Sequence, residues 1–390
     1  MGAPQWWQLT GGMSITIPDD VPTASNRDDA FVALHRDSRH PWGMHARGPG
    51  LAMVAALTAC GVGDGYHPWW DGDKGAIVTS PATPLPDAGV RPADAGGGGG
   101  PDTGTEAAPP PGPPIQTVFF VLMSSQPWSI VEGSKSAPYI NGNLLPGAAH
   151  CEAYFSAPTQ VSGSEPNVLW LEGGQDFGFV TNNPPPVNHT ASTSHLVDQL
   201  EAAGVTWKAY VEGATAGLCP IVDSSPYRTY NVPFLFFDDV VGTPPAADAK
   251  RCIEHVVPYT QLASDIAKNA VPRYAFVVPN TCDDMHDDCN TGDPIKQGDD
   301  WLSTAVPPIL ASKAYTDAGA VFIAWDFAST GYVPIGFIAL SAKARPGYAG
   351  MTTLTSSSAL RSLQEIFGVG PLLGDAKNAS DVKGLFESFP

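Results

Sequence analysis

The chain has 390 residues, of which 43% are hydrophobic and 15% charged, and 20 Lys and Arg against 39 Asp and Glu give a formal net charge of −19. This length suffices for one large α/β domain or two smaller ones. The acidic balance argues against nucleic acid as a partner, because binding to a phosphate backbone requires clustered Lys and Arg. Solvated extracellular proteins commonly carry such a charge, and this is the simplest explanation for it.

The N-terminal part contains a short apolar segment that is typical of an export signal. Residues 44–60 start with basic residues, continue through an apolar run over 51–59 and end in Leu-Thr-Ala-Cys60. The run is too short to span a bilayer but suits the core of a signal peptide. Leu-Thr-Ala-Cys resembles a bacterial lipobox, so we expect Cys60 to carry lipid and to anchor the protein to a membrane of the cell envelope, facing the periplasm or the cell surface. A small buried apolar helix is the alternative.

The segments on either side of this signal have no expected place in a folded domain. If residues 44–60 are a lipoprotein signal peptide, residues 1–43 have no role in the mature protein, and we expect Met44 to be the true start. Residues 61–115 contain a glycine run and a proline run and few large apolar side chains. Such a composition cannot offset the entropy lost on ordering, so we expect a disordered spacer. The folded domain is expected over residues 116–390.

The chain elements after residue 116 alternate between strand and helix patterns. Continuous apolar runs predict strands over 117–123, 205–211, 274–278, 320–325 and 336–340. Amphipathic patterns predict helices over 194–203, 259–270, 301–316 and 357–367. This alternation predicts an α/β fold with a mostly parallel central sheet and helices on both faces. In such sheets the active crevice lies beyond the carboxyl ends of the strands, so the residues after each strand are the ones to inspect.

Five cysteines remain besides the lipidation candidate, an odd number. Cys282 and Cys289 are close enough in sequence to staple one loop, and Cys219 and Cys252 bracket one segment and could form a second bridge. Cys151 would then be free. An exported protein can keep disulfides, although sequence alone does not fix their connectivity.

Four short strings follow predicted strands or begin a predicted helix. Residues 123–128 read Met-Ser-Ser-Gln-Pro-Trp, residues 162–167 Ser-Gly-Ser-Glu-Pro-Asn, residues 282–289 Cys-Asp-Asp-Met-His-Asp-Asp-Cys and residues 325–327 Trp-Asp-Phe. Their order resembles that of the bacterial phosphoesterase family of acid phosphatases and phospholipases C, over most of the chain from about residue 116 to 389. The resemblance implies an alkaline-phosphatase-like fold, a serine or threonine nucleophile and a divalent metal ion.

The resemblance also implies roles for five residues. Ser164 stands where the family has its nucleophile, and Asn167 matches a second position of the same motif. Asp326 matches one of two neighbouring carboxylates that bind metal, and Asp284 and His286 could reach a metal ion or hold a phosphate oxygen. Two purely structural interpretations remain open. The serine motif could be a helix start with Ser as N-cap and Pro at the first or second helical position. The cysteine-bounded string could be a stapled acidic loop that binds calcium or nothing.

Other positions depart from the family pattern. Ser124 and Ser125 stand where the family carries Glu and Asn, Phe327 stands where it carries the second carboxylate, and Ser162 and Ser356 stand where it carries His. Neutral hydroxyls are poor replacements for carboxylates, because hard cations prefer anionic oxygen ligands. A serine nucleophile without a metal ion or an adjacent base is weak.

Two functions therefore remain open for the domain. The first is a membrane-anchored phosphoric ester hydrolase that is weakly active or inactive. It would bind at most one divalent metal ion, weakly, with no other cofactor, and would take a phosphate ester or another anionic small ligand. The second is a non-catalytic binding or structural lipoprotein on the same fold.

Overall fold

A computed structural model describes residues 114–157, 163–289 and 292–390. The expected signal peptide with Cys60, the residues before it, the spacer up to residue 113 and Ser162 lie outside the described residues. In the part that is described, no helix is long and apolar enough to cross a membrane.

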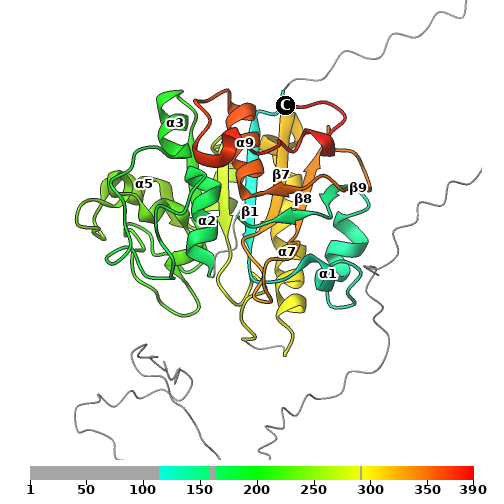
Figure 1. Cartoon of the computed structure of the whole chain (residues 1–390), viewed down its shortest axis with the longest axis horizontal. Helices are drawn as coiled ribbons and strands as arrows, with labels where there is room; N and C mark the ends of the chain where they lie inside the picture. Colours follow the sequence, from blue (N-terminus) through cyan, green and yellow to red (C-terminus); the bar gives the residue numbers. More distant parts are fainter. Residues whose placement is uncertain (1–113, 158–162, 290–291) are drawn as a thin grey trace, which may run out of the picture. The chain divides into compact units, whose positions relative to one another are not determined.

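The described fold is built on an eight-stranded sheet with the strand order β5-β4-β6-β1-β7-β8-β2-β9 (Figure 1). Neighbouring strands run parallel from β5 to β7, whereas β8 is antiparallel to both β7 and β2. The bounds are β1 Thr117–Met123, β2 Ala149–Cys151, β4 Trp207–Val211, β5 Val256–Pro258, β6 Tyr274–Val278, β7 Gly319–Trp325, β8 Phe337–Ser341 and β9 Tyr348–Gly350. A separate parallel pair consists of β3 Tyr154–Phe155 and β10 Leu354–Thr355.

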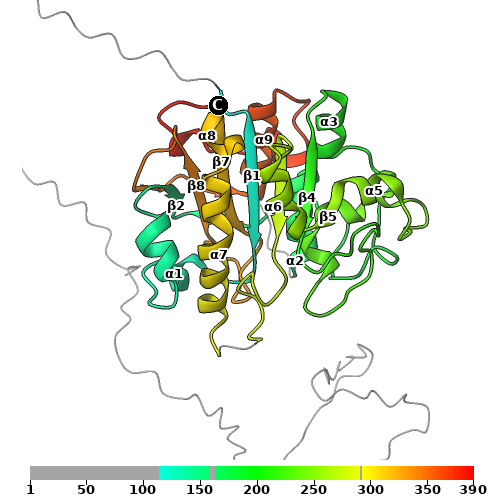
Figure 2. The same ribbon diagram turned by 180° about the vertical axis from the view of Figure 1, so that it is seen from behind.

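Helices cover both faces of this sheet. The helices α2 and α9 lie in front of it in Figure 1, and α6, α7 and α8 lie on the opposite side in Figure 2. The bounds are α1 Trp128–Val131, α2 Ser164–Gly173, α3 Leu196–Ala202, α4 Asp238–Val241, α5 Lys250–His255, α6 Thr260–Ala267, α7 Pro294–Leu310, α8 Lys313–Ala318 and α9 Ser356–Phe367. Short 3-10 turns cover Thr229–Asn231, Pro233–Phe236, Gly374–Lys377 and Lys383–Leu385, and a π turn covers Ile140–Leu144. The predicted α/β class with a mostly parallel sheet is confirmed.

The central strand β1 shows why a strand could be predicted from an apolar run in the sequence. Every residue of β1 is buried, because helices cover both of its faces and β6 and β7 flank its edges. Such a strand carries a continuous apolar run rather than an alternating one. The predicted bounds of 117–123 and 274–278 agree with β1 and β6.

The helix predicted over 301–316 was wrong in its bounds, because two helices meet in this region. The first, α7, begins at Pro294, where the side chain of Asp293 accepts a hydrogen bond from the backbone N–H of Lys296. The second, α8, begins after Ser312, whose side chain accepts from the N–H of Tyr315. Each polar side chain satisfies a backbone donor that a helix start leaves free, so each marks a boundary.

The cysteines pair as the sequence suggested. Cys219 bonds to Cys252 and Cys282 bonds to Cys289. Cys151 is free and buried, and burial raises the pKa of its thiol to about 11. Because the thiolate is the reactive form of cysteine, this residue is chemically inert at neutral pH.

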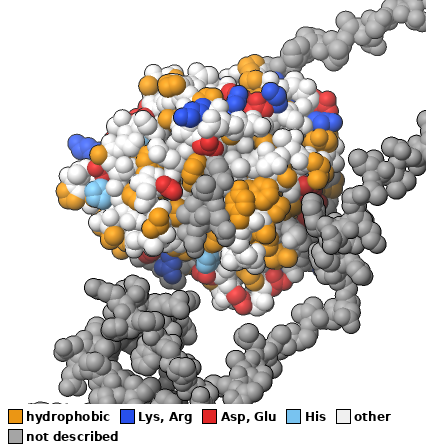
Figure 3. Space-filling model, in the orientation of Figure 1, with side chains coloured by type: hydrophobic (Ala, Val, Ile, Leu, Met, Phe, Trp, Pro, Cys, Tyr) orange, Lys and Arg blue, Asp and Glu red, His pale blue; other side chains and the backbone are white. Residues whose placement is uncertain are grey.

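The exposed side chains of one face can be followed in the space-filling view. Figure 3 shows that several Lys and Arg side chains lie along the upper edge of the described part of this face, beside Asp and Glu side chains, and that few lie elsewhere on it. This distribution accords with the small number of basic residues in the sequence.

Candidate functional site

The carboxyl ends of β1, β6 and β7 lie at one edge of the sheet, the lower edge in Figure 1, and the start of α2 lies there too. The Oγ atom of Ser124 donates a hydrogen bond of 3.2 Å to Oδ2 of Asp326, and the backbone N–H of Ser124 donates one of 2.8 Å to the carbonyl of Asp284. The hydroxyl of Ser164 lies close enough to Asp326 to lower the pKa of that carboxyl. Four residues singled out from sequence therefore meet in one cluster.

The carboxylate of Asp326 is fully buried and is held by uncharged donors. Its Oδ1 atom accepts hydrogen bonds from the backbone N–H groups of Ser125 at 3.2 Å and Phe327 at 2.7 Å, while Oδ2 accepts from Ser124. Burial raises the pKa of Asp326, and the nearby hydroxyls of Ser164 and Ser124 lower it in part. Both carboxylate oxygens of Asp326 therefore have hydrogen-bond partners within the protein.

The second carboxylate of the cluster, Asp284, is also buried. It accepts a 2.9 Å hydrogen bond from Nδ2 of Asn231 and a 2.8 Å bond from the backbone N–H of His286. Burial raises its pKa well above the usual range, and the negative charges of Asp326 and Asp287 raise it further. Burial and the neighbouring negative charges thus both disfavour the ionised form of Asp284.

The three predicted metal ligands do not form a complete set of ligand atoms. The ring of His286 is partly exposed and its Nδ1 lies 2.8 Å from Oδ1 of Asp287. Among the residues that the structure describes, two groups of three His, Asp or Glu have ligand atoms within 4.8 Å of one another, and neither contains Asp326, Asp284 or His286. Asp284 and Asp326 have only serine hydroxyls beside them as further oxygen ligands. These are too few anionic oxygen ligands to hold a divalent ion tightly. The assignment of these three residues to a metal stays a prediction.

The start of α2 differs from the simple capping interpretation. Gly163 is the N-cap, so Ser164 is the first helical residue and Pro166 the third. The backbone of Gly163 has a φ of +94°, and a Cβ atom there would lie 2.7 Å from Oδ1 of Asn182. Only glycine therefore fits this turn without strain. The interpretation of Ser as N-cap with Pro at the first or second helical position is wrong.

The hydroxyl of Ser164 is buried, and among the described residues it has no hydrogen bond of standard geometry. Its neighbours in the motif have structural roles. The carboxylate of Glu165 accepts hydrogen bonds from the backbone of Asn183 at 2.7 Å and from Nδ2 of Asn188 at 2.6 Å, and burial raises its pKa to about 7. Nδ2 of Asn167 donates a 2.6 Å bond to the carbonyl of Gly163. Glu165 and Asn167 thus fix the turn that presents Ser164.

Two loops of the cluster have left-handed backbone conformations at residues other than glycine. Ser125 has a φ of +67° and Met285 a φ of +78°. Asparagine adopts this region several-fold more readily than most residues. The resemblance described above predicts Asn at position 125, and the positive φ of Ser125 agrees with that prediction.

Two further positions singled out from the sequence, Ser356 and Phe327, also lie at or near this edge. Ser356 begins α9 and is buried; burial raises the pKa of Tyr154, and the nearby side chain of Ser356 lowers it in part. Phe327 follows Asp326 and is partly buried. Sequence reasoning missed Tyr154 and Asn231, which contribute to this region from segments without a recognisable motif.

A second polar cluster, which we call the His195 network, connects α2 to α5. His195 is buried, with Nδ1 3.0 Å from Oε1 of Glu172 and Nε2 3.2 Å from Oδ2 of Asp239. Arg251 forms ion pairs with Asp239 and, at 2.6 Å, with Asp198. Burial lowers the pKa of His195, but the hydrogen bonds to Asp239 and Glu172 outweigh it and raise the pKa to about 9. No sequence motif pointed to this network.

Comparison with known proteins agrees with the predicted family. A model described as the phosphoesterase family matches residues 134–370, which include the serine motif, the cysteine-bounded loop and the Trp-Asp-Phe motif. The phosphatidylinositol-3-phosphatase of Mycobacterium tuberculosis is 29% identical over 277 residues, covering 70% of this chain and 84% of that protein. A probable acid phosphatase of Kluyveromyces lactis is 24% identical over 170 residues, covering 42% of this chain and 37% of that protein.

Two solved structures illustrate the structural likeness. A phosphonate monoester hydrolase from Silicibacter pomeroyi is 12% identical, with a TM-score of 0.45 and coverage of 70% of this chain and 77% of that chain. A protein in the alkaline phosphatase superfamily from Vibrio parahaemolyticus is 11% identical, with a TM-score of 0.47 and coverage of 67% and 68%.

Proposed function

Because the chain belongs to the phosphoesterase family, we propose that it is an exported lipoprotein whose phosphoesterase domain hydrolyses phosphate esters slowly or not at all. One observation carries the proposal. Ser124 donates a hydrogen bond to Asp326, and the sequence resemblance predicts a metal-binding Glu at position 124 and a metal-binding carboxylate at position 326. A neutral serine hydroxyl thus lies beside Asp326 at the place where a second carboxylate would help Asp326 to bind a metal ion.

The chemistry of the cluster supports slow turnover. Attack of Ser164 Oγ on phosphorus requires loss of its proton, and Asp326 is the neighbouring group that can accept it. The developing negative charge on the phosphoryl oxygens needs a cation or several donors, and this electrostatic contribution is usually the largest part of catalysis. The two carboxylates instead repel an anionic substrate. The N-terminus of α2 supplies only a partial positive charge beside Ser164.

Phosphate monoesters are the ligand class that we propose for this site. The support is the similarity to the phosphatidylinositol-3-phosphatase over most of both chains. At the start of α2 the backbone N–H of Glu165 donates to Oδ1 of Asn182 at 3.0 Å and Pro166 has no N–H, so a phosphate there would meet mainly the partial positive charge of the helix terminus. The alternative function, binding without hydrolysis, is favoured by the same substitutions that weaken the metal site.

The lipoprotein part of the proposal is supported by the apolar run that ends in Leu-Thr-Ala-Cys60 and by the spacer-like composition after it. It places the domain at a membrane of the cell envelope. Mass spectrometry of the native membrane fraction would test it, and an unlipidated peptide that crosses the Ala59–Cys60 bond in mature protein would contradict it.

Hydrolysis is tested with p-nitrophenyl phosphate and full-length protein in the presence of magnesium, calcium, manganese or zinc. We expect turnover close to the uncatalysed background, with no change in Ser164→Ala. The matched control is Ser362→Ala, which removes an equally buried hydroxyl from the middle of α9. Robust turnover that Ser164→Ala abolishes and Ser362→Ala preserves would overturn the proposal and establish an active phosphoesterase.

A further inference from the structure

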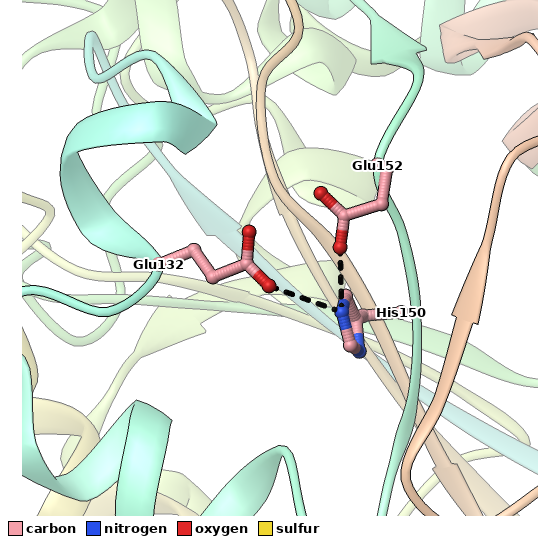
Figure 4. Close-up of side chains that lie close together, drawn as sticks. All are labelled: Glu132, His150 and Glu152. Carbon is pink, nitrogen blue, oxygen red and sulfur yellow. Dashed lines mark hydrogen bonds and ion pairs between the residues drawn. The ribbon is translucent and has the colours of Figure 1, made fainter.

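We propose that Glu132, His150 and Glu152 form a binding site for a divalent transition-metal ion of the zinc type. Glu132 directly follows α1, His150 lies in β2 and Glu152 follows β2. Figure 4 shows the three side chains pointing toward one another. The inference is independent of the proposed function, because none of these residues belongs to the cluster around Ser164 and Asp326.

The ligand atoms already lie near the separations of a coordinated ion. His150 Nε2 is 3.4 Å from Oε1 of Glu132 and 2.8 Å from Oε1 of Glu152, and all three ligand atoms lie within 4.8 Å of one another. With bonds of about 2.0–2.1 Å, tetrahedral zinc holds its ligand atoms about 3.3–3.4 Å apart. An ion therefore requires the Glu152 oxygen to move away from the ring by only about half an ångström.

The chemistry of the three groups suits the same ion. One imidazole nitrogen and two carboxylate oxygens match the ligands of zinc, whereas calcium and magnesium prefer oxygen alone. The side chain of His150 is 7% exposed and that of Glu132 is 38% exposed. The buried imidazole thus forms the floor of the site, and the fourth coordination position faces solvent, where water can fill it.

Charge also favours a cation at this position. Within residues 114–157, 163–289 and 292–390, neither Glu132 nor Glu152 forms an ion pair with Lys or Arg, and His150 is their basic neighbour. A divalent ion would neutralise both carboxylates at once.

The His195 network provides the contrast. The possible ligand atoms of His195, Asp198 and Asp239 also lie within 4.8 Å of one another. There, however, Arg251 already binds both aspartates. The guanidinium group of Arg251 already supplies the positive charge that a metal ion would bring. We therefore expect a metal ion at the Glu132 site and none in the His195 network.

The surroundings hold the ligands in place. His150 pairs with Ile338 of β8 on one side and Ala349 of β9 on the other, which fixes its backbone. Nε1 of Trp128 donates a 3.2 Å hydrogen bond to Oε2 of Glu152, leaving Oε1 directed at the ring of His150. Such outer hydrogen bonds orient metal ligands.

One outer contact is missing. Nδ1 of His150 is buried and has no hydrogen-bond partner among the described residues. A histidine that binds metal through one nitrogen usually donates a hydrogen bond from the other, and loss of such a partner costs about 10- to 100-fold in affinity. We therefore expect zinc to bind about 10- to 100-fold more weakly than at a complete structural site.

The test uses full-length protein stripped of metal with EDTA and titrated with zinc chloride by calorimetry. We expect a zinc affinity that falls at least about tenfold in Glu132→Gln. Glu201→Gln is the matched control, because the Glu201 side chain is also 38% exposed and also lies near a histidine, but Arg251 binds it. This control should leave the affinity unchanged. Cobalt in place of zinc should give the visible absorption of a tetrahedral complex, which Glu132→Gln removes.

A second measurement separates binding at this site from binding elsewhere on the full chain. Zinc at about 100 times its dissociation constant should raise the melting temperature by about 5 °C. The double variant Glu132→Gln/Glu152→Gln should melt near the metal-free protein and lose this response. Equal zinc binding in the double variant, or no bound zinc in the unmodified protein, would overturn the proposal.

Discussion

The His195 network and the candidate site both bury charged side chains, but they balance these charges differently. In the network, Asp198 and Asp239 share Arg251, and His195 adds a second positive charge. At the candidate site, Asp284 and Asp326 are held by amide and hydroxyl donors, and no Lys or Arg of the described chain forms an ion pair with either. Uncompensated buried carboxylates reduce stability, so the fold has no structural reason of its own to keep them.

Backbone geometry does not separate the two regions. Ser125 and Met285, both beside the candidate site, have positive φ angles. Phe177 also has a positive φ, and its ring packs against Phe237, which stacks on the ring of His195. The two regions therefore differ in how their buried charges are balanced and not in where the backbone departs from its usual conformations.

The largest effect that would sharpen this comparison is a pH dependence of stability due to His195. The pKa of His195 is about 9 in the folded protein, against about 6.5 in an unfolded chain. The protonated ring therefore stabilises the folded protein fully below about pH 6.5. This stabilisation, about 3 kcal/mol, is lost as pH rises toward about 9. Urea unfolding of the full chain at pH 6, 7.5 and 9 measures it.

The variant His195→Gln should lose most of this dependence on pH. His189→Gln is the control, because His189 also pairs with an aspartate, Asp238, but is 31% exposed. It should keep the dependence of the unmodified protein. A stability that does not change between pH 6.5 and 9 would show that the network is not held by a charged imidazole.

The next effect concerns the candidate site. We expect Ser124→Glu, Ser125→Asn and Phe327→Glu together to raise the affinity for divalent metal about 100-fold, because affinity at oxygen-ligand sites rises steeply with the number of charged ligands. Calorimetry with magnesium, calcium, manganese and zinc measures this gain. The measurement uses a Glu132→Gln background, so that the separately proposed site does not contribute.

The matched control replaces the two introduced glutamates by glutamines and keeps Ser125→Asn. This control has the same side-chain sizes without the charges, and we expect it to bind no better than the Glu132→Gln background. An equal gain in both variants, or no gain in either, would contradict the assignment of these positions from sequence.

The sequence predicted those parts of the fold that leave a local pattern. The apolar runs of β1 and β6 gave the bounds of both strands, because strands buried on both faces need a continuous run. The antiparallel direction of β8 was not predictable, because an apolar run carries no information about strand direction. The three-residue strands β2 and β9 were missed for a related reason, since a few residues cannot establish a period.

The candidate site was predictable where it follows motifs. Ser164 and Asp326 came from strings next to a helix start and a strand end, and the structure brings them together. Asn231, which holds Asp284 from 53 residues away, carries no such signal. The His195 network was missed because its residues come from separate helices whose packing alone brings them together. Motifs can therefore be recognised from the local sequence, whereas contacts between distant segments are known only once the fold is known.

The smallest expected effect is the most direct test of the comparison. In Asp326→Asn the amide oxygen can still accept from the backbone of Ser125 and Phe327, and the amide nitrogen can donate to Ser124. The change removes a charge that repels Asp284. We expect the free energy of unfolding at pH 7 to stay within about 1 kcal/mol of the original value or to rise, as measured by urea unfolding.

The matched variant in the network is Asp239→Asn, which removes the same charge but leaves Arg251 and His195 with fewer anionic partners. It should lower the free energy of unfolding by about 2 kcal/mol, somewhat less than a fully buried pair would lose, because Asp239 is 24% exposed. If Asp326→Asn destabilised the protein more than Asp239→Asn, the carboxylate of Asp326 would have a stabilising partner and the proposed contrast between the two regions would be wrong. A rise in the free energy of unfolding in Asp326→Asn, beside a fall in Asp239→Asn, would show that the candidate site keeps its buried charge at the expense of stability.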